Sequence, residues 1–154
     1  MSNLVTEEHL ESVIKHIDEN IEESINKLKT FLNIPSISTD PKYKDDVHRC
    51  AEWITQELKN IGLDAKCHKT NGHPMVTAID DTAGSDAPRI LYYGHYDVQP
   101  PEPLCEWETD PFNATVKDSP HGGKIVARGA ADGPRPPGEE SARPESGAGP
   151  LVKR

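Results

Sequence analysis

The sequence predicts an α/β fold: part of a central mixed or parallel sheet flanked by helices, followed by a disordered C-terminal tail. Three observations support this. Two stretches carry apolar residues every three or four positions, the period then changes to two, and a short, nearly all-apolar run follows. Helices followed by strands are typical of a layered α/β domain. The length of 154 residues corresponds to about one domain, which we place at residues 1–132.

The first predicted helix ends before Pro35, because the residue that precedes a proline is driven out of helical angles. Thr6 supplies a side-chain cap, and Glu7 and Glu8 place negative charge in the first turn. This helix is either a packing element or an amphipathic helix that binds a partner. Its apolar face is formed by Leu10, Val13, Ile14, Ile17, Ile21, Leu28 and Leu32.

A second helix is predicted over Lys44–Ile61, after a loop that contains Pro35 and Pro41. Gly62 follows at once, as a left-handed C-terminal cap requires. Cys50 lies on the apolar side of this helix, so we interpret it as a small core residue.

Several short strands follow. The alternation that begins at Leu63, the Asn71-Gly72 turn signal and the stretch Met75–Ile79 predict a β-hairpin. Arg89–Gly94 is the run that fits a central strand covered on both faces. Two further strands are expected at 114–117 and 124–127, on either side of a turn at 119–123.

Residues 133–154 differ from the rest of the chain. They contain four Gly and five Pro and no apolar periodicity. A segment of this composition cannot bury enough apolar surface to offset its ordering entropy, so we expect it to be disordered.

Charge and composition exclude several classes of partner. The net charge of −9 disfavours nucleic acid and anionic membranes, which both attract basic surface. The N-terminus lacks the features of a secretory signal, and no stretch is apolar enough to span a bilayer. Three cysteines at irregular spacing are best interpreted as reduced thiols. We therefore expect a cytoplasmic protein.

Chemistry is most plausible at the end of the apolar run, at Gly94-His95-Tyr96-Asp97-Val98. Side chains two residues apart share one face of an extended backbone, so His95 and Asp97 lie on the same side. A metal-bound imidazole usually donates its other N–H to a carboxylate, and Asp97 is placed to accept it. The spacing alone does not separate a metal ligand from a hydrogen-bonded surface histidine. The other histidines, His9, His16, His48, His68, His73 and His121, are expected to face solvent.

Three motifs, taken together, point to a family. They are Gly-His-Tyr-Asp-Val-Gln-Pro-Pro at 94–101, Trp-Glu-Thr-Asp-Pro-Phe at 107–112 and Gly-Lys-Ile-Val-Ala-Arg-Gly-Ala-Ala-Asp at 123–132. In this order they resemble the zinc-dependent amidohydrolytic peptidases, which include carnosinase, aminoacylase, carboxypeptidase G and succinyl-diaminopimelate desuccinylase. The forms at 98–101 and 107–112 look most like the dipeptidase branch. The resemblance covers roughly residues 10–132, the N-terminal part of such an enzyme.

The resemblance implies specific roles. His95 matches a metal ligand, Asp97 matches the catalytic aspartate behind it, and Asp132 matches the carboxylate that bridges two zinc ions. The implied reaction is hydrolysis of the amide bond of a small peptide or N-acyl amino acid. Trp107 is expected to pack under the loop after the His-x-Asp strand, with substrate contact as the alternative.

The sequence departs from the family pattern directly after Asp132, where it reads Gly-Pro-Arg-Pro-Pro-Gly. The Glu-Glu pair that supplies the general base and a ligand, a further acidic ligand and a distant histidine cannot be placed. Glu139-Glu140 lies in the Pro/Gly-rich tail, with no predicted strand before it, and is not expected to be that pair. A shifted reading frame or a truncated gene would explain the change.

Two candidate metal ligands, His95 and Asp132, cannot fill two zinc sites of about four ligands each. We therefore expect an inactive relative of a two-zinc dipeptidase. The alternative is a non-catalytic fragment that binds a partner protein through an exposed sheet edge and its amphipathic helices. A stand-alone metal-binding module is the least favoured interpretation, because too few ligands are present.

Overall fold

The computed structural model describes residues 6–120, 122–131 and 148–150. Within these residues the structure contains two helices and five short strands, together with the 3-10 turns η1 (Pro41–Tyr43) and η2 (Leu104–Glu106). The strands form two separate antiparallel sheets. The predicted α/β class is confirmed, but each sheet in the described residues is small and antiparallel rather than central and parallel.

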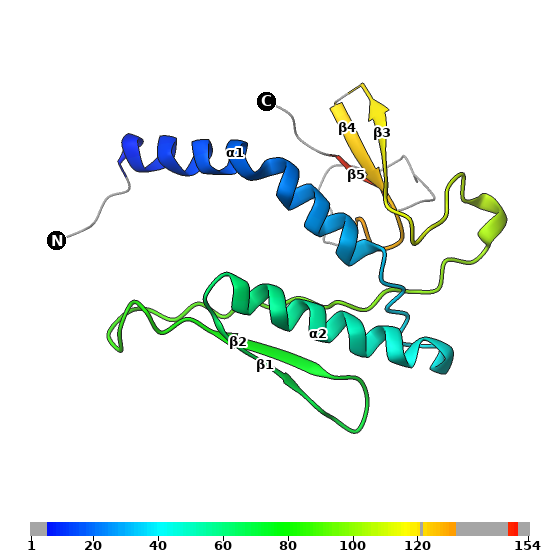
Figure 1. The fold of residues 1–154 in the computed structure, drawn as a ribbon, viewed down its shortest axis with the longest axis horizontal. Coiled ribbons are helices and arrows are strands. Elements are labelled where there is room, and N and C mark those ends of the chain that lie inside the picture. The colour runs from blue at the N-terminus through cyan, green and yellow to red at the C-terminus, as the bar shows by residue number, and fades with distance from the viewer. Residues whose placement is uncertain (1–5, 121, 132–147, 151–154) are drawn as a thin grey trace.

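Helix α1 spans Glu7–Leu32, and the Thr6 side chain accepts a hydrogen bond from the His9 amide at its N-terminus. Its N-terminal half extends away from the rest of the molecule (Figure 1). The predicted apolar face therefore packs only near the C-terminal end. Leu32 is buried there, whereas five residues farther back are 42–55% exposed: Leu10, Val13, Ile17, Ile21 and Leu28.

Helix α2 spans Lys44–Asn60 and packs on the hairpin formed by β1 (Asp64–His68) and β2 (Met75–Ile79). Gly62 follows the helix with φ +93°, as predicted for a left-handed cap. The hairpin pairs Ala65 with Ala78, but residues 69–74 form a longer loop than a two-residue Asn-Gly turn. Figure 1 shows the hairpin on the face of α2 that is turned away from α1.

The second sheet contains β3 (Thr115–Ser119), β4 (Gly122–Val126) and β5 (Ala148–Pro150). Strands β3 and β4 overlap the strands predicted at 114–117 and 124–127, but both extend into the predicted turn at 119–123. Within the tail, the backbone of β5 pairs with β4. Backbone hydrogen bonding needs no apolar pattern, so composition gave no signal for this strand. The other residues of 133–154 lie outside the described residues.

An apolar cluster joins the end of α1 to the second sheet through Leu32, Ala114, Ile125 and Ala127. Other buried residues are Val47, Cys50 and Ala51 on α2, Ala65 on β1, and Ile37 in the loop after α1. The rings of Phe31 and Trp53 stack between the two helices, with centroids 5.7 Å apart.

The central strand predicted at Arg89–Gly94 is wrong for the described residues. Ile90, Leu91, Tyr92 and Tyr93 are 84–93% exposed and belong to no strand. A central strand is buried by neighbouring strands and by helices on both faces. The described residues provide no such partners for this segment, so its apolar side chains remain in solvent.

Candidate metal-binding arm at His95 and Asp97

The site lies directly after the exposed residues 90–93, where residues 96–98 contact the loop that follows α1. Val98 forms a parallel bridge with Ile37, and the Val98 amide donates to the Ser36 carbonyl at 3.0 Å. The Ser36 hydroxyl donates to the Tyr96 carbonyl at 2.7 Å. Tyr96 is further fixed by its phenol, which donates to the Pro74 carbonyl at 2.6 Å. These bonds hold residues 96–98 against the loop that follows α1.

His95 and Asp97 lie together, as the spacing predicts. Nδ1 of His95 is 3.1 Å from the Asp97 carbonyl oxygen and 3.3 Å from Oδ1 of the Asp97 side chain. A carbonyl oxygen can only accept a hydrogen bond, so this geometry favours the tautomer in which Nδ1 carries the proton. Nε2 then has the lone pair that a metal ion requires.

The carboxylate of Asp97 is held from its other side. The Ser38 hydroxyl donates to Oδ2 of Asp97 at 2.5 Å, and the Ser38 carbonyl lies 2.8 Å from Nε2 of His73. None of Ser36, Ser38 and His73 was predicted as a site residue. The contact between Ser38 and Asp97 joins residues 59 positions apart. A local sequence pattern cannot predict a contact over that separation.

A cavity of about 530 Å³ lies beside this arrangement. The ends of Ser38, His73, His95 and Asp97 line its polar part, and Val47, Ile54, Leu58, Met75 and Val76 contribute apolar wall. His95 and Asp97 are both about half exposed, at 48% and 40% for their side chains. The imidazole is therefore accessible to a small ligand.

Burial shifts the pKa values of two groups behind the site. It raises the pKa of the Cys50 thiol to about 11, and it raises the pKa of the Tyr96 phenol to about 12. Both groups are thus neutral near pH 7. Cys50 is fully buried, which confirms its prediction as a core residue, whereas Cys67 and Cys105 are exposed free thiols.

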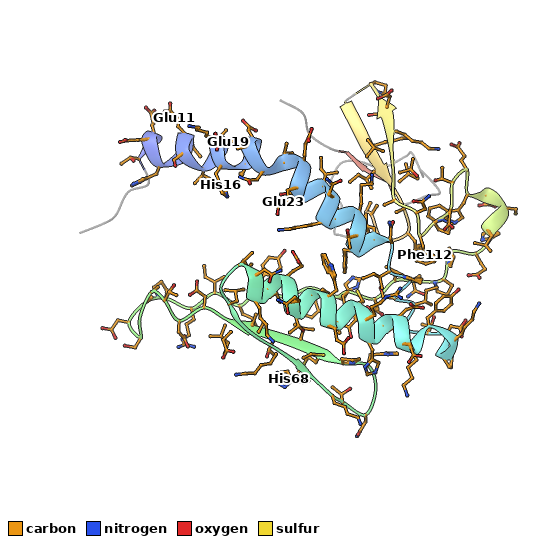
Figure 2. The ribbon with its side chains drawn as sticks, in the orientation of Figure 1. Glu11, His16, Glu19, Glu23, His68 and Phe112 are labelled. Atoms are coloured by element: carbon orange, nitrogen blue, oxygen red, sulfur yellow. The ribbon has the colours of Figure 1, made fainter. Side chains whose placement is uncertain are left out.

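The remaining predicted residues lie elsewhere. Asp132, Glu139, Glu140 and His121 fall outside the described residues. Trp107 is half-buried, and its indole N–H donates to the Pro101 carbonyl at 2.7 Å, as a packing role requires. Figure 2 shows His16 on α1 and His68 on the hairpin, both exposed. His73 is also exposed, but it contacts the site loop rather than only solvent.

The fit to a metal is partial. Imidazole nitrogen backed by a carboxylate suits zinc. Within residues 6–120, 122–131 and 148–150, however, no group of three or more His, Cys, Asp or Glu side chains converges on one point. The described residues thus offer one ligand and its outer carboxylate. The same part of the chain contains no helix long and apolar enough to cross a membrane.

Comparisons with known proteins identify dipeptidases that are similar to this chain. No family model matches the chain. A cysteinylglycine-S-conjugate dipeptidase of Corynebacterium striatum is 32% identical over 114 residues, which is 73% of this chain and 24% of the relative. A Cys-Gly metallodipeptidase of Schizosaccharomyces pombe is 30% identical and covers 80% of this chain, and 27% of its own length is matched.

The chain is a homologue of these metallopeptidases. It spans about a quarter of the length of the curated relatives just described. A solved dipeptidase from Saccharomyces cerevisiae matches with a TM-score of 0.66 and 27% identity, over 79% of this chain and 27% of that one. Human carnosine dipeptidase 1 matches with a TM-score of 0.63 over the same shares. The resemblance found in the sequence motifs is thereby confirmed.

Proposed function

We propose that His95, with Asp97 behind it, is one metal-binding arm of a zinc-dependent peptidase centre. The observation that supports this is the contact of Nδ1 with the Asp97 carbonyl and carboxylate, which favours a proton on Nδ1 and a lone pair on Nε2. When bound, zinc would polarise an amide carbonyl and lower the pKa of a bound water molecule. Asp132, the bridging carboxylate implied by resemblance, completes the proposal.

The substrate class follows from the relatives. The names of the two curated relatives specify cysteinylglycine S-conjugates and Cys-Gly. We propose that the parent reaction is hydrolysis of the amide bond in small peptides or N-acyl amino acids. The free thiols of Cys50, Cys67 and Cys105 support a cytoplasmic setting for this chemistry.

We further infer that a polypeptide of these 154 residues does not turn over a substrate by itself. A catalytic zinc ion needs about three protein ligands and an open position. The described residues supply one, and the residues that line the cavity include no glutamate, the residue type that the resemblance implies as the general base.

The test measures zinc content and dipeptide hydrolysis together. We expect the 154-residue chain to bind zinc, His95→Ala to weaken that binding at least tenfold, and neither protein to hydrolyse Cys-Gly. His16→Ala is the matched control, because His16 is an exposed histidine on α1 (Figure 2). Equal zinc binding by wild type and His95→Ala would refute the proposed arm. Turnover that His95→Ala abolishes would support the arm and refute the inferred inactivity.

A second candidate function is binding to another polypeptide. The four exposed apolar residues Ile90, Leu91, Tyr92 and Tyr93 favour it, because an extended apolar segment with no partner strand is a template for strand addition. Sedimentation velocity would show concentration-dependent association that Leu91→Lys suppresses. Ile61→Lys, at another exposed position, is the control. A strictly monomeric wild-type chain would count against this candidate.

A further inference from the structure

The loop after α1 presents two serines, two residues apart, to residues 96–97 of the site. Ser36 and Ser38 both donate hydrogen bonds to residues 96–97, but to acceptors of different kinds. Ser36 bonds to a backbone carbonyl, that of Tyr96. Ser38 bonds to a side-chain oxygen, Oδ2 of Asp97. The first bond fixes the path of the chain, whereas the second fixes the orientation of a carboxylate.

The orientation of this carboxylate determines whether one of its oxygens lies close to Nδ1 of His95. With Oδ2 held by Ser38, Oδ1 lies 3.3 Å from Nδ1 of His95. A carboxylate without the serine hydroxyl could rotate about its terminal bond and turn toward solvent, because Asp97 is 40% exposed. The imidazole would then lose one of the two Asp97 acceptors that favour the Nδ1–H tautomer.

Ser38 is itself held in place. Its carbonyl oxygen lies 2.8 Å from Nε2 of His73, a donor from the hairpin loop, and its neighbour Ile37 is buried and pairs with Val98. The hydroxyl is therefore presented from a backbone that is fixed on both sides. A hydrogen bond from a fixed donor orients its acceptor more strongly than one from a mobile side chain.

We propose that Ser38 is a positioning residue of the metal-binding arm: its hydroxyl holds Asp97 so that His95 keeps its proton on Nδ1 and presents Nε2 as a ligand. The metal-binding part of this inference rests on the proposed function. The positioning part concerns only Ser38, Asp97 and His95, and it can be measured without metal.

The experiment compares three variants of the full chain. Ser38→Ala removes the hydroxyl, and Ser38→Thr keeps it. Ser36→Ala removes the neighbouring serine bond without touching the carboxylate. The first readout is the tautomer of His95, from imidazole ¹⁵N shifts at about pH 8, above the ordinary histidine pKa. The second readout is the dissociation constant for zinc alone.

We expect Ser38→Ala to lower the Nδ1–H fraction of His95 and to weaken zinc binding about tenfold, the lower end for loss of an outer-shell partner. Ser38→Thr should restore both readouts. Ser36→Ala should lower the thermal stability but leave the tautomer unchanged. Ser38→Cys, which preserves the side-chain volume and supplies a weak donor, gives an intermediate tautomer fraction if Ser38→Ala does not fold.

The outcomes separate this inference from the proposed function. An unchanged tautomer and zinc affinity in Ser38→Ala would overturn the positioning role and leave the His95 arm standing. An equal tautomer shift in Ser36→Ala would also overturn it, because the loop as a whole would then be responsible. A tautomer shift in Ser38→Ala, with no zinc binding by the wild type, would support positioning and refute the proposed function.

Discussion

Gly129 provides a sharp test of how closely the turn after β4 packs against Val98, next to the site. Its φ is +80°, and a Cβ built on it would lie 2.7 Å from Cγ1 of Val98, the residue after Asp97. Gly129→Ala therefore carries two costs. The left-handed backbone costs an L-residue about 1–2 kcal/mol. Overpacking against Val98 adds about 1–3 kcal/mol.

The expected loss in the free energy of unfolding is thus about 2–5 kcal/mol, measured by urea denaturation followed by circular dichroism. Gly62→Ala is the matched control. Gly62 has φ +93° with nothing within 4 Å of its Cβ position, so only the backbone cost applies. In a Val98→Ala background the two glycine substitutions should cost nearly the same. Equal losses for Gly129→Ala and Gly62→Ala in the wild-type background would refute the close approach.

Two further predictions concern groups near the core. Asn33→Ala should lower the free energy of unfolding by about 1–3 kcal/mol, measured by thermal unfolding. Asn33 Oδ1 accepts a hydrogen bond from the Ala114 amide at 2.7 Å, and that part-buried amide would lose its partner. The control Asn60→Ala, at an exposed position, should change the free energy of unfolding by less than about 0.5 kcal/mol. At pH 8 an aromatic disulfide reagent should modify Cys67 promptly and Cys50 only on unfolding. Because the folded pKa of Cys50 is raised to about 11 from 9.0, the stability due to its neutral thiol is intact below pH 9 and is lost as pH rises toward 11. Rapid labelling of all three thiols in the folded chain would contradict this.

Local signals predicted most elements of the fold. Both helices begin and end near Thr6, Pro35, Lys44 and Gly62, where cap residues act within one turn. The hairpin and strands β3 and β4 also follow from alternation and turn residues. These features depend on neighbours in sequence, so a single sequence is enough to find them.

Elements that depend on distant partners could not be predicted in this way. Arg89–Gly94 has the composition of a central strand, but such a strand forms only where neighbours pair with it. Strand β5 has no strand composition, yet it pairs with the edge of β4. In both cases, whether the segment forms a strand depends on whether a neighbouring strand is available to pair with it.

In the candidate site, too, the local contact could be predicted from the sequence and the long-range contact could not. The contact of His95 with Asp97 follows from two-residue spacing on an extended backbone. The hydrogen bond from Ser38 follows from tertiary packing across 59 positions, and only the structure reveals it. The two-residue spacing alone did not distinguish a metal ligand from a surface histidine at His95. The resemblance to the family is what implies a ligand role.

The most direct test of the account is to add zinc to ¹⁵N-labelled chain and follow the ring nitrogens of every histidine. We expect Nε2 of His95 to shift first, while Nδ1 of the same ring stays protonated. Zinc that shifts Nδ1 of His95, or that binds other histidines and leaves His95 unchanged, would contradict it.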